Sequence, residues 1–503
     1  MTYQISKVMT FALISVLLYV TVSVTAPIIA GNYIISTLGG SRDLAHYMVC
    51  FYAFGYALGL PLVKPLLKKM SPRKALMGCF LLFGIMMILC AAAQSYYQLV
   101  IARFIQGMIG GPLLPLATNM LLYFIPAEKK HTLVKYMLAA SVIAPVLGTT
   151  FGGVIAYAYH WRLIFLLPIP IIVGLSLLFF HHLQDEPIPT PTTGFNLIGY
   201  LLFFLSIFCL GTATTLGQYL DWNRSTIIVS LFAVGGLSLI LYLLFDIGHP
   251  SPVLDLSLFK RLHFSMAMVY LSVLFGSYLG LIIMLGFWLT FDVTFTTWWI
   301  LLLLGHMFIA AGVLFTIVDK MARIDMRIWL ALSIVLFICS AAFAKGFSVE
   351  IDFWRLAIAR TMAGFSLALF VYSLSNISSQ NMNPIEKYEQ GITFHVFRCL
   401  GIGLGTSIFS TVLLRRSVFF HERLGSQLTS FSVETKMFFY KAGLINLKGA
   451  AAQAELLEQL DTQANALALN DTFYLLMWVS IALLVILIMT LFIKRDHVQV
   501  SSN

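Results

Sequence analysis

Two nine-residue stretches, LVIARFIQG at 99–107 and LAIARTMAG at 356–364, share Leu, Ile, Ala, Arg and Gly at five aligned positions. A second pair, APVLGTT at 144–150 and GIGLGTS at 401–407, aligns at the same offset of 257 residues. Two matches at one offset are hard to attribute to apolar composition alone. The sequence therefore predicts two similar halves within one chain.

The sequence around the two repeats suggests how the chain is divided into domains. We predict an N-terminal half at 1–183, a linker with two inserted spans at 184–260, and a C-terminal half at 261–503. The segment HHLQDEPIPTPTTG (181–194), rich in Pro and Thr, marks the join. The C-terminal half contains a long predicted loop, 415–470.

The composition predicts a chain that lies in a lipid bilayer. Of its 503 residues 60% are hydrophobic and 10% are charged, and the mean hydropathy is +0.91. A soluble domain is about 45–50% apolar and about 25% charged. The six cysteines fall inside apolar runs without metal-ligand spacing, so we expect no metal site and no cofactor. No phosphate-binding loop for ATP and no cluster of catalytic residues is present in the sequence, so we expect no enzyme.

The apolar runs predict an all-α polytopic fold. A helix that crosses a bilayer needs about 20 mostly apolar residues, and fourteen segments qualify. They are 8–30, 45–66, 75–94, 97–124, 133–158, 162–182, 196–217, 226–246, 264–288, 296–318, 328–345, 353–378, 391–413 and 471–493. The first run is too long for a signal peptide, so we interpret it as a span of the mature chain. Fourteen spans put both termini on one side.

The distribution of Lys and Arg predicts which side that is. With the N-terminus in the cytoplasm, most basic residues outside the predicted spans fall in cytoplasmic loops, and an excess there sets the orientation. The most basic short stretch, KPLLKKMSPRK (64–74), then lies in the loop between spans 2 and 3. The net charge of +10 is explained by this topology, so we expect no nucleic-acid partner.

Small residues recur at helical spacing in both halves. Ala144, Gly148 and Gly152 lie four apart, and Gly401 and Gly405 repeat the spacing. Small residues at this spacing let helix backbones approach closely in a membrane. Two interpretations stay open at this point: ordinary helix packing, or a thin seam along which two bundles move.

Several of these stretches resemble the major facilitator superfamily. RFIQGMIGG (103–111) is similar to its fourth-helix motif, and APVLGTTFGG (144–153) resembles its fifth-helix antiporter motif, which ends here at Gly152 and Gly153 and has Thr149 where the family usually has Pro. Six more stretches resemble the fourteen-helix drug–proton antiporter branch, of the EmrB/QacA type. They are PIIAG (27–31), HWRLIFLLPIP (160–170), LDWNRS (220–225), PVLDLSLFKRLHF (252–264), RCLGIGLG (398–405) and NDTF (470–473).

The resemblance implies a fold and a function. The fold is the major facilitator fold, with two pseudo-symmetric six-helix bundles and two inserted helices. The function is that of a secondary exporter in the inner membrane of a bacterium, which moves small amphipathic molecules out by alternating access against a proton gradient. In loop 415–470 the stretch AAQAELLEQLDTQANALAL (451–469) predicts an amphipathic helix. It could dock a periplasmic adaptor and an outer-membrane channel, or lie passively on the membrane surface.

The loop after span 2 departs from the family pattern Gly-x-Leu-x-Asp-Arg-x-Gly-Arg-Arg. Lys64 replaces the first Gly, Lys68 the Asp and Ser71 the second Gly. The counterpart loop, DKMARIDMR (319–327), keeps an acid at Asp319. We therefore predict that the cytoplasmic latch between the halves depends on the second loop, and that the first loop is mainly an anchor. The latch set is Asp319, Arg323, Arg327 and Lys68.

The ionisable residues within the spans are basic. We place no acid near the middle of a span, and the family's span-1 acid aligns with Leu18. The candidate pathway residues are Arg103, Gln106, Arg360, His306, His395 and Arg398. Arg103 and Arg360 could instead bind backbone carbonyls of a neighbouring helix. His395 could titrate in place of the missing carboxylate, or be a hydrogen-bonded structural residue. Arginines without acids favour, as an alternative function, export of an anionic metabolite or siderophore with atypical or absent proton coupling.

Overall fold

The computed structural model describes residues 7–41, 44–125, 127–183, 194–321, 324–429 and 431–500, and the regular elements among them are all helices. In chain order, with 3₁₀ helices marked η, these are α1 (Lys7–Thr25), α2 (Pro27–Leu38), α3 (Tyr47–Gly59), η2 (Leu60–Leu62), α4 (Val63–Lys69), α5 (Pro72–Ala92), α6 (Tyr96–Gly110), α7 (Leu113–Phe124), α8 (Ala127–Ala158), α9 (Leu163–Leu166), α10 (Ile169–His182), α11 (Leu197–Leu216), η3 (Trp222–Arg224), α12 (Thr226–Asp246), η4 (Leu256–Lys260), α13 (Leu262–Phe291), α14 (Thr297–Met321), α15 (Met326–Ala344), α16 (Phe353–Ser378), α17 (Pro384–Gly425), α18 (Val433–Leu444) and α19 (Ala450–Val500).

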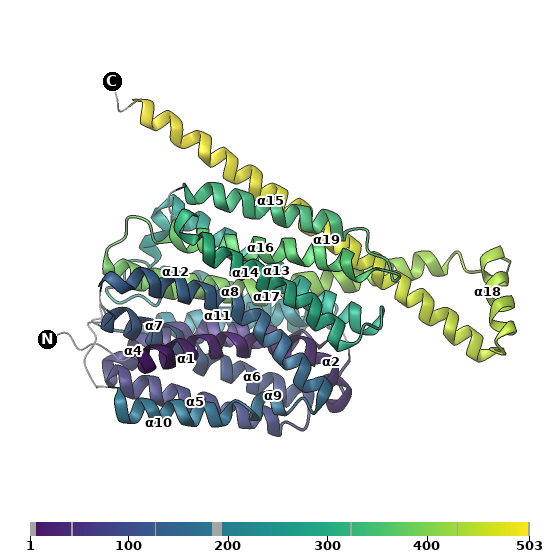
Figure 1. The fold of residues 1–503 in the computed structure, drawn as a ribbon, viewed down its shortest axis with the longest axis horizontal. Coiled ribbons are helices and arrows are strands. Elements are labelled where there is room, and N and C mark those ends of the chain that lie inside the picture. The colour runs from purple at the N-terminus through teal and green to yellow at the C-terminus, as the bar shows by residue number, and fades with distance from the viewer. Residues whose placement is uncertain are drawn as a thin grey trace.

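The helices form an all-α bundle in which the long elements run side by side (Figure 1). Twelve stretches of the described chain are long and apolar enough to cross a membrane. The helices α8 and α14 coincide with the predicted spans 133–158 and 296–318, so the arrangement is compatible with fourteen spans. The all-α polytopic prediction is confirmed.

Proline explains why several spans consist of two helices. Pro27 begins α2 directly after α1, and Pro112 lies between α6 and α7. Pro168 separates α9 from α10 in the same way. A proline has no N–H to donate and its ring collides with the preceding turn, so a helix bends or restarts there.

The two ends of the bundle differ in shape. At one end, on the left of Figure 1, lie α4, the start of α1 and the last turns of α19; we call it the Lys64 end. At the other, the α18 end, α17 and α19 project beyond the other helices and are joined through α18. Helices of the first half (α1–α10) lie mainly in the lower part of this view and those of the second half (α13–α19) mainly in the upper part.

The segment 415–470 is a helical projection rather than a loop, which corrects the prediction. Its helix at 451–469 lies where it was expected, but it is continuous with the last span within α19, and α17 runs on to Gly425. Polar pairs join the two extensions: Arg416 with Asp471 at 2.5 Å and His421 with Asp461 at 2.6 Å. Hydropathy ends a span where polar residues begin, although the helix itself continues.

The repeated small residues pack helices within each half. A Cβ added at Gly152 would lie 1.8 Å from the carbonyl oxygen of Ala26, at the end of α1. In the second half a Cβ at Gly401 would lie 2.4 Å from the carbonyl oxygen of Ser272 in α13. The pairs α1–α8 and α13–α17 are therefore in backbone contact, as small residues in membrane helices permit. The other members of the motif, Ala144, Gly148, Gly153 and Gly405, lie on the same two helices.

The halves meet along a seam between α3 and α17. His46 and Ser410 are 3.1 Å apart near the α18 end. Deeper in the seam, the ring of Phe54 packs on Gly403, where an added Cβ would lie 2.4 Å from the ring. The inserted helix α11 borders the seam, because its Thr215 hydroxyl is 2.9 Å from that of Ser407. A second contact between the halves joins α8 to α14.

Candidate functional site

A buried ion pair joins the halves at the Lys64 end of the seam. Lys64, the first residue of the basic stretch, is 2% exposed, and its Nζ lies 2.7 Å from Oε2 of Glu389 in α17. The same Nζ donates to the carbonyl oxygens of Pro252 (3.0 Å) and Val253 (3.1 Å). Lys64, a residue of the first half, therefore contacts both the segment after the inserted helices and the second half.

The segment around Val253 is held in place by a second buried carboxylate. Asp246, at the end of α12, accepts from the backbone N–H of Val253 at 2.9 Å and of Leu254 at 3.3 Å. It also accepts from Nδ2 of Asn196 at 3.1 Å. These bonds fix the loop so that its carbonyl oxygens point at Lys64. Removing one partner of such a buried network leaves an uncompensated charge, which is strongly unfavourable.

The arginine of the first repeat is bound entirely within the first half. Arg103 in α6 is fully buried and donates to Oε1 of Gln106 at 2.7 Å and to the backbone carbonyl of Ser23 at 2.8 Å. Its guanidinium also lies 4.0 Å from the ring centroid of Tyr52, within range of a cation–π contact. This geometry matches the carbonyl-binding interpretation of Arg103.

The arginine of the second repeat has a similar aromatic neighbour. Arg360 in α16 is 5.7 Å from the ring of Phe473 in the last helix of its half, and Arg103 is 5.8 Å from Phe165 in the last span of the first half. The two arginines of the repeat thus share one feature in space, an aromatic ring of a later helix in the same half. Arg360 also lines a small cavity between the halves, together with Ile29 of α2.

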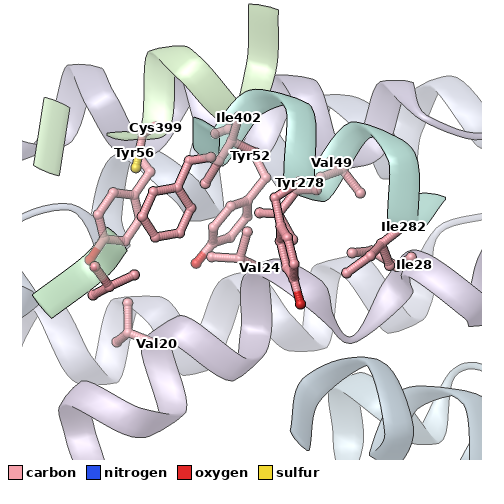
Figure 2. Close-up of a cluster of buried hydrophobic side chains, with 14 of the residues drawn as sticks. Val20, Val24, Ile28, Val49, Tyr52, Tyr56, Tyr278, Ile282, Cys399 and Ile402 are labelled. Carbon is pink, nitrogen blue, oxygen red and sulfur yellow. The ribbon is translucent and has the colours of Figure 1, made fainter. Parts of the chain in front are cut away.

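The middle of the seam is apolar and aromatic. Figure 2 shows Tyr52 and Tyr56 of α3 between Val20 and Val24 of α1 on one side and helix α17 on the other. Cys399 and Ile402 of α17 and Tyr278 and Ile282 of α13 complete this cluster, and all of them are buried. Such a wall can contact the apolar part of a ligand while tyrosine hydroxyls supply a few polar contacts.

Polar groups on α17 border this cluster. Arg398 is buried and lies 5.7 Å from the ring of Phe275, and His395 is one turn earlier on the same helix. The Nε atom of Arg398, the Nδ1 atom of His395 and the Tyr56 hydroxyl are buried and have no hydrogen-bond partner among the described residues. Buried polar atoms are normally paired, so these three could bind polar groups of a ligand.

Other predicted residues lie elsewhere. His306 in α14 packs against Phe353 and Trp354, and Trp354 is exposed, so it does not join Arg398 and His395. Leu18 is half-buried on α1, which contains no carboxylate. Of the predicted latch, Lys68 is exposed and Arg327 is half-buried at the Lys64 end. The side chain of Asp319 and the whole of Arg323 lie outside the described residues.

Sequence reasoning missed the partner of Lys64. Glu389 lies just before predicted span 13, and Lys64 was interpreted as part of an anchor. One signal was present: Lys64 lies inside the predicted span 45–66, whereas Lys68 and Lys69 lie beyond its end and are exposed. Hydropathy cannot say which distant acid such a lysine meets, because the two residues belong to different halves.

Comparisons with known proteins agree with this architecture. Residues 11–410 match the family model of the Major Facilitator Superfamily. The multidrug export protein EmrB of Escherichia coli K12 is 26% identical over 93% of this chain and 90% of its own length. The fatty acid resistance protein FarB of Neisseria gonorrhoeae is 28% identical over 82% of this chain and 80% of its own length.

Solved structures show the same fold at low identity. A bacterial homologue of the human lysosomal transporter Spinster, in an inward-facing and unoccupied conformation, superposes with a TM-score of 0.60 at 13% identity over 96% of this chain and 97% of that one. The nucleoside transporter NupG superposes with a TM-score of 0.56 at 15% identity over 94% and 99%. With a family model that covers most of its length and a bundle of this architecture, the chain belongs to the Major Facilitator Superfamily.

Proposed function

We propose that this protein is a secondary active exporter, which moves small amphipathic molecules, drug-like compounds or metabolites, out of the cytoplasm by alternating access coupled to protons. The observation that carries the proposal is the seam itself. It combines a buried aromatic and apolar cluster with unpaired polar atoms on Arg398, His395 and Tyr56. Relatives along most of the chain are named as exporters of drugs. Transport of this kind needs no chemical conversion, so the proposal assigns no enzymatic reaction.

The Lys64–Glu389 pair supplies a gate for this cycle. While the pair is closed, Lys64 and Glu389 neutralise each other away from water and hold the halves together at that end. Opening exposes both charges to water, where each can be solvated. Asp319, which belongs to α14, is proposed to assist this gate where α14 contacts α8, and Arg323 and Lys68 are proposed to assist it from the two cytoplasmic loops.

The proposal includes an orientation in the membrane. We place the protein in the inner membrane of a bacterium, with the Lys64 end and both termini in the cytoplasm, because basic residues concentrate there. The α17–α18–α19 projection then extends on the opposite side. Its exposed apolar residues, such as Phe431 and Tyr440, support its use as a docking site for a periplasmic adaptor that leads to an outer-membrane channel.

A second candidate is export of an anionic metabolite or siderophore. The seam residues near the aromatic cluster include the buried cation Arg398. Among described residues, buried carboxylates occur at Asp246 and Glu389, both of which belong to the Lys64-end network. An anion would gain a charged hydrogen bond from Arg398, whereas a lipophilic cation would be repelled.

Flux through the purified protein in sealed vesicles tests the proposal. We expect saturable movement of a fluorescent fatty acid or of ethidium, driven by an imposed pH gradient and abolished by an uncoupler. Arg398→Gln should raise the half-saturating concentration of the fatty acid about tenfold and leave that of ethidium unchanged if the substrate is anionic. Absence of any gradient-driven flux for a broad panel of amphipathic probes would contradict an exporter, and equal loss of both probes would contradict the anionic alternative.

A further inference from the structure

A second cavity lies inside the C-terminal half, away from the seam. Its volume is about 400 Å³, within the range of about 300–1,000 Å³ common for small-molecule sites. It is formed at the Lys64 end by the first turns of α13 and α15, the last turns of α16, and residues 487 and 490 of α19. None of these residues takes part in the Lys64–Glu389 network.

The rim of this cavity is basic. Arg327, in the first turn of α15, is half-buried, and His263, in the first turn of α13, lines the same cavity. Asp325 uses its carboxylate to accept from the backbone N–H of Arg327 at 3.0 Å. The guanidinium itself has no ion pair or hydrogen bond with any part of the chain that the structure describes. Among the described side chains, none competes with a ligand for this guanidinium.

The wall below the rim is apolar. Met266, Leu330 and Leu487 contribute aliphatic surface, and the small side chain of Ala267 lines the same cavity. The Tyr270 hydroxyl already has a hydrogen-bond partner, because it donates to the backbone carbonyl of Leu483 at 2.8 Å. From His263 to Tyr270 the cavity runs along two turns of α13, a depth of about 10 Å. The cavity thus offers a cation at its mouth and hydrocarbon below.

The surroundings of the cavity indicate where a ligand would come from. Leu262 beside the mouth is 66% exposed, Ile328 on α15 is 55% exposed and Met489 on α19 is 59% exposed. In a membrane protein such apolar exposed faces contact acyl chains. Because the mouth lies at the first turns of α13 and α15, it is near the level of the lipid headgroups.

We propose that this cavity binds an anionic phospholipid from the surrounding bilayer, with its phosphate on Arg327 and one acyl chain against Met266, Leu330 and Leu487. A guanidinium matches a phosphate in charge and in planar donor geometry, and the chain length that the wall can cover suits an acyl tail. Basic pockets between membrane helices at the headgroup level are known to recognise such lipids. The site is separate from the seam, so the proposal does not depend on what the protein transports.

Native mass spectrometry of the full-length protein tests this site. We expect phosphatidylglycerol, added back to delipidated protein, to bind with about tenfold weaker affinity to Arg327→Ala than to the unmodified protein. Lys387→Ala is the matched control: Lys387 is exposed at the same end of the same half, in the first turn of α17, and should bind the lipid as before. Equal weakening by both substitutions would show a diffuse charge effect and overturn the proposal.

A second substitution separates the cavity from its rim. Ala267→Trp keeps Arg327 but fills the space for the acyl chain, so lipid retention should fall to the level of Arg327→Ala. Phosphatidylethanolamine should bind more weakly than phosphatidylglycerol to the unmodified protein. If phosphatidylethanolamine binds equally well, if oleate displaces phosphatidylglycerol completely at equal concentration, or if Ala267→Trp retains the lipid, the cavity is not an anionic phospholipid site.

Discussion

Several charged side chains of this protein are buried, where a charge is energetically unfavourable unless it has a partner. Lys64 and Glu389 come from opposite halves, and Asp246 is satisfied by backbone N–H groups that orient the carbonyls next to Lys64. When a charged side chain is buried in one conformation and hydrated in another, the buried conformation is stable only if an oppositely charged partner is present. The pair therefore ties the closed Lys64 end to two specific side chains.

Neutralising one member of the pair should open the Lys64 end. In Glu389→Gln the buried Lys64 retains only two carbonyl oxygens, and a buried charge that loses its partner costs about 3–5 kcal/mol. We expect a cysteine placed at Val253 to react with a water-soluble maleimide at least tenfold faster in Glu389→Gln than in the otherwise unmodified protein. Proteoliposomes without substrate suffice for the measurement.

The control for this prediction is an ion pair within one half. Glu386 lies three residues earlier on α17 and pairs with Arg261 at 2.6 Å, and both side chains are partly exposed. Water screens an exposed pair, so it contributes little to stability, and Glu386→Gln should leave the maleimide reaction nearly unchanged. Equal rates in Glu389→Gln and the parent protein would refute a gating role for the pair.

At the scale of helices, the sequence predicted where each helix lies better than where it ends. The fourteen apolar ranges all coincide with helices, and the repeated glycines mark the helix pairs that touch. The extent of α17 and α19 was underestimated because polar residues continue both helices beyond the apolar stretch. Helix formation depends on backbone bonds and local propensity, which a polar side chain such as Asp461 does not interrupt.

The candidate site was only partly predictable for a related reason. Arg103, Arg360 and Arg398 could be located because a charge in an apolar run is conspicuous. Their partners could not: Arg103 binds a carbonyl of Ser23, which any residue could supply, and Lys64 meets Glu389 across the seam. Pairing between halves depends on their relative placement, which leaves no local pattern in the chain.

The contact between α1 and α8 gives a prediction at this scale. A Cβ at Gly152 would lie 1.8 Å from the carbonyl oxygen of Ala26, so the helices must move apart in Gly152→Ala. Overpacking of this kind costs about 1–3 kcal/mol, and the apparent melting temperature in detergent should fall by several degrees.

Gly78, in the helix α5, is the matched control for this substitution. No atom lies within 4 Å of the position of an added Cβ there. Gly78→Ala should therefore leave the melting temperature unchanged or raise it slightly, because alanine favours helix over glycine. A melting temperature that falls equally in both variants would mean that the close approach of α1 and α8 is not what limits stability.

At the scale of the whole molecule, alternating access requires the two halves to move against each other along the seam. The contacts across the seam run from His46, just before α3, with Ser410 of α17 to Lys64 of α4 with Glu389 of α17, so in this conformation the seam is closed at both ends. Export through the middle of the bundle is possible only if parts of this seam separate in turn. A covalent bond across it should stop the cycle.

Ser407→Cys provides that bond with a single substitution. The Ser407 hydroxyl lies 3.5 Å from the sulfur of Cys50 on α3, and a disulfide needs two such side chains within a few ångströms in a suitable geometry. After mild oxidation we expect export by Ser407→Cys to fall by more than 90%, and a reductant should restore it. The same substitution combined with Cys50→Ser should be insensitive to oxidant, which excludes effects of the other cysteines. A mobility shift or mass analysis would show whether the disulfide forms. If it forms and export continues at its former rate, the halves do not separate at this depth. The substrate must then cross the protein by a route other than the seam between α3 and α17.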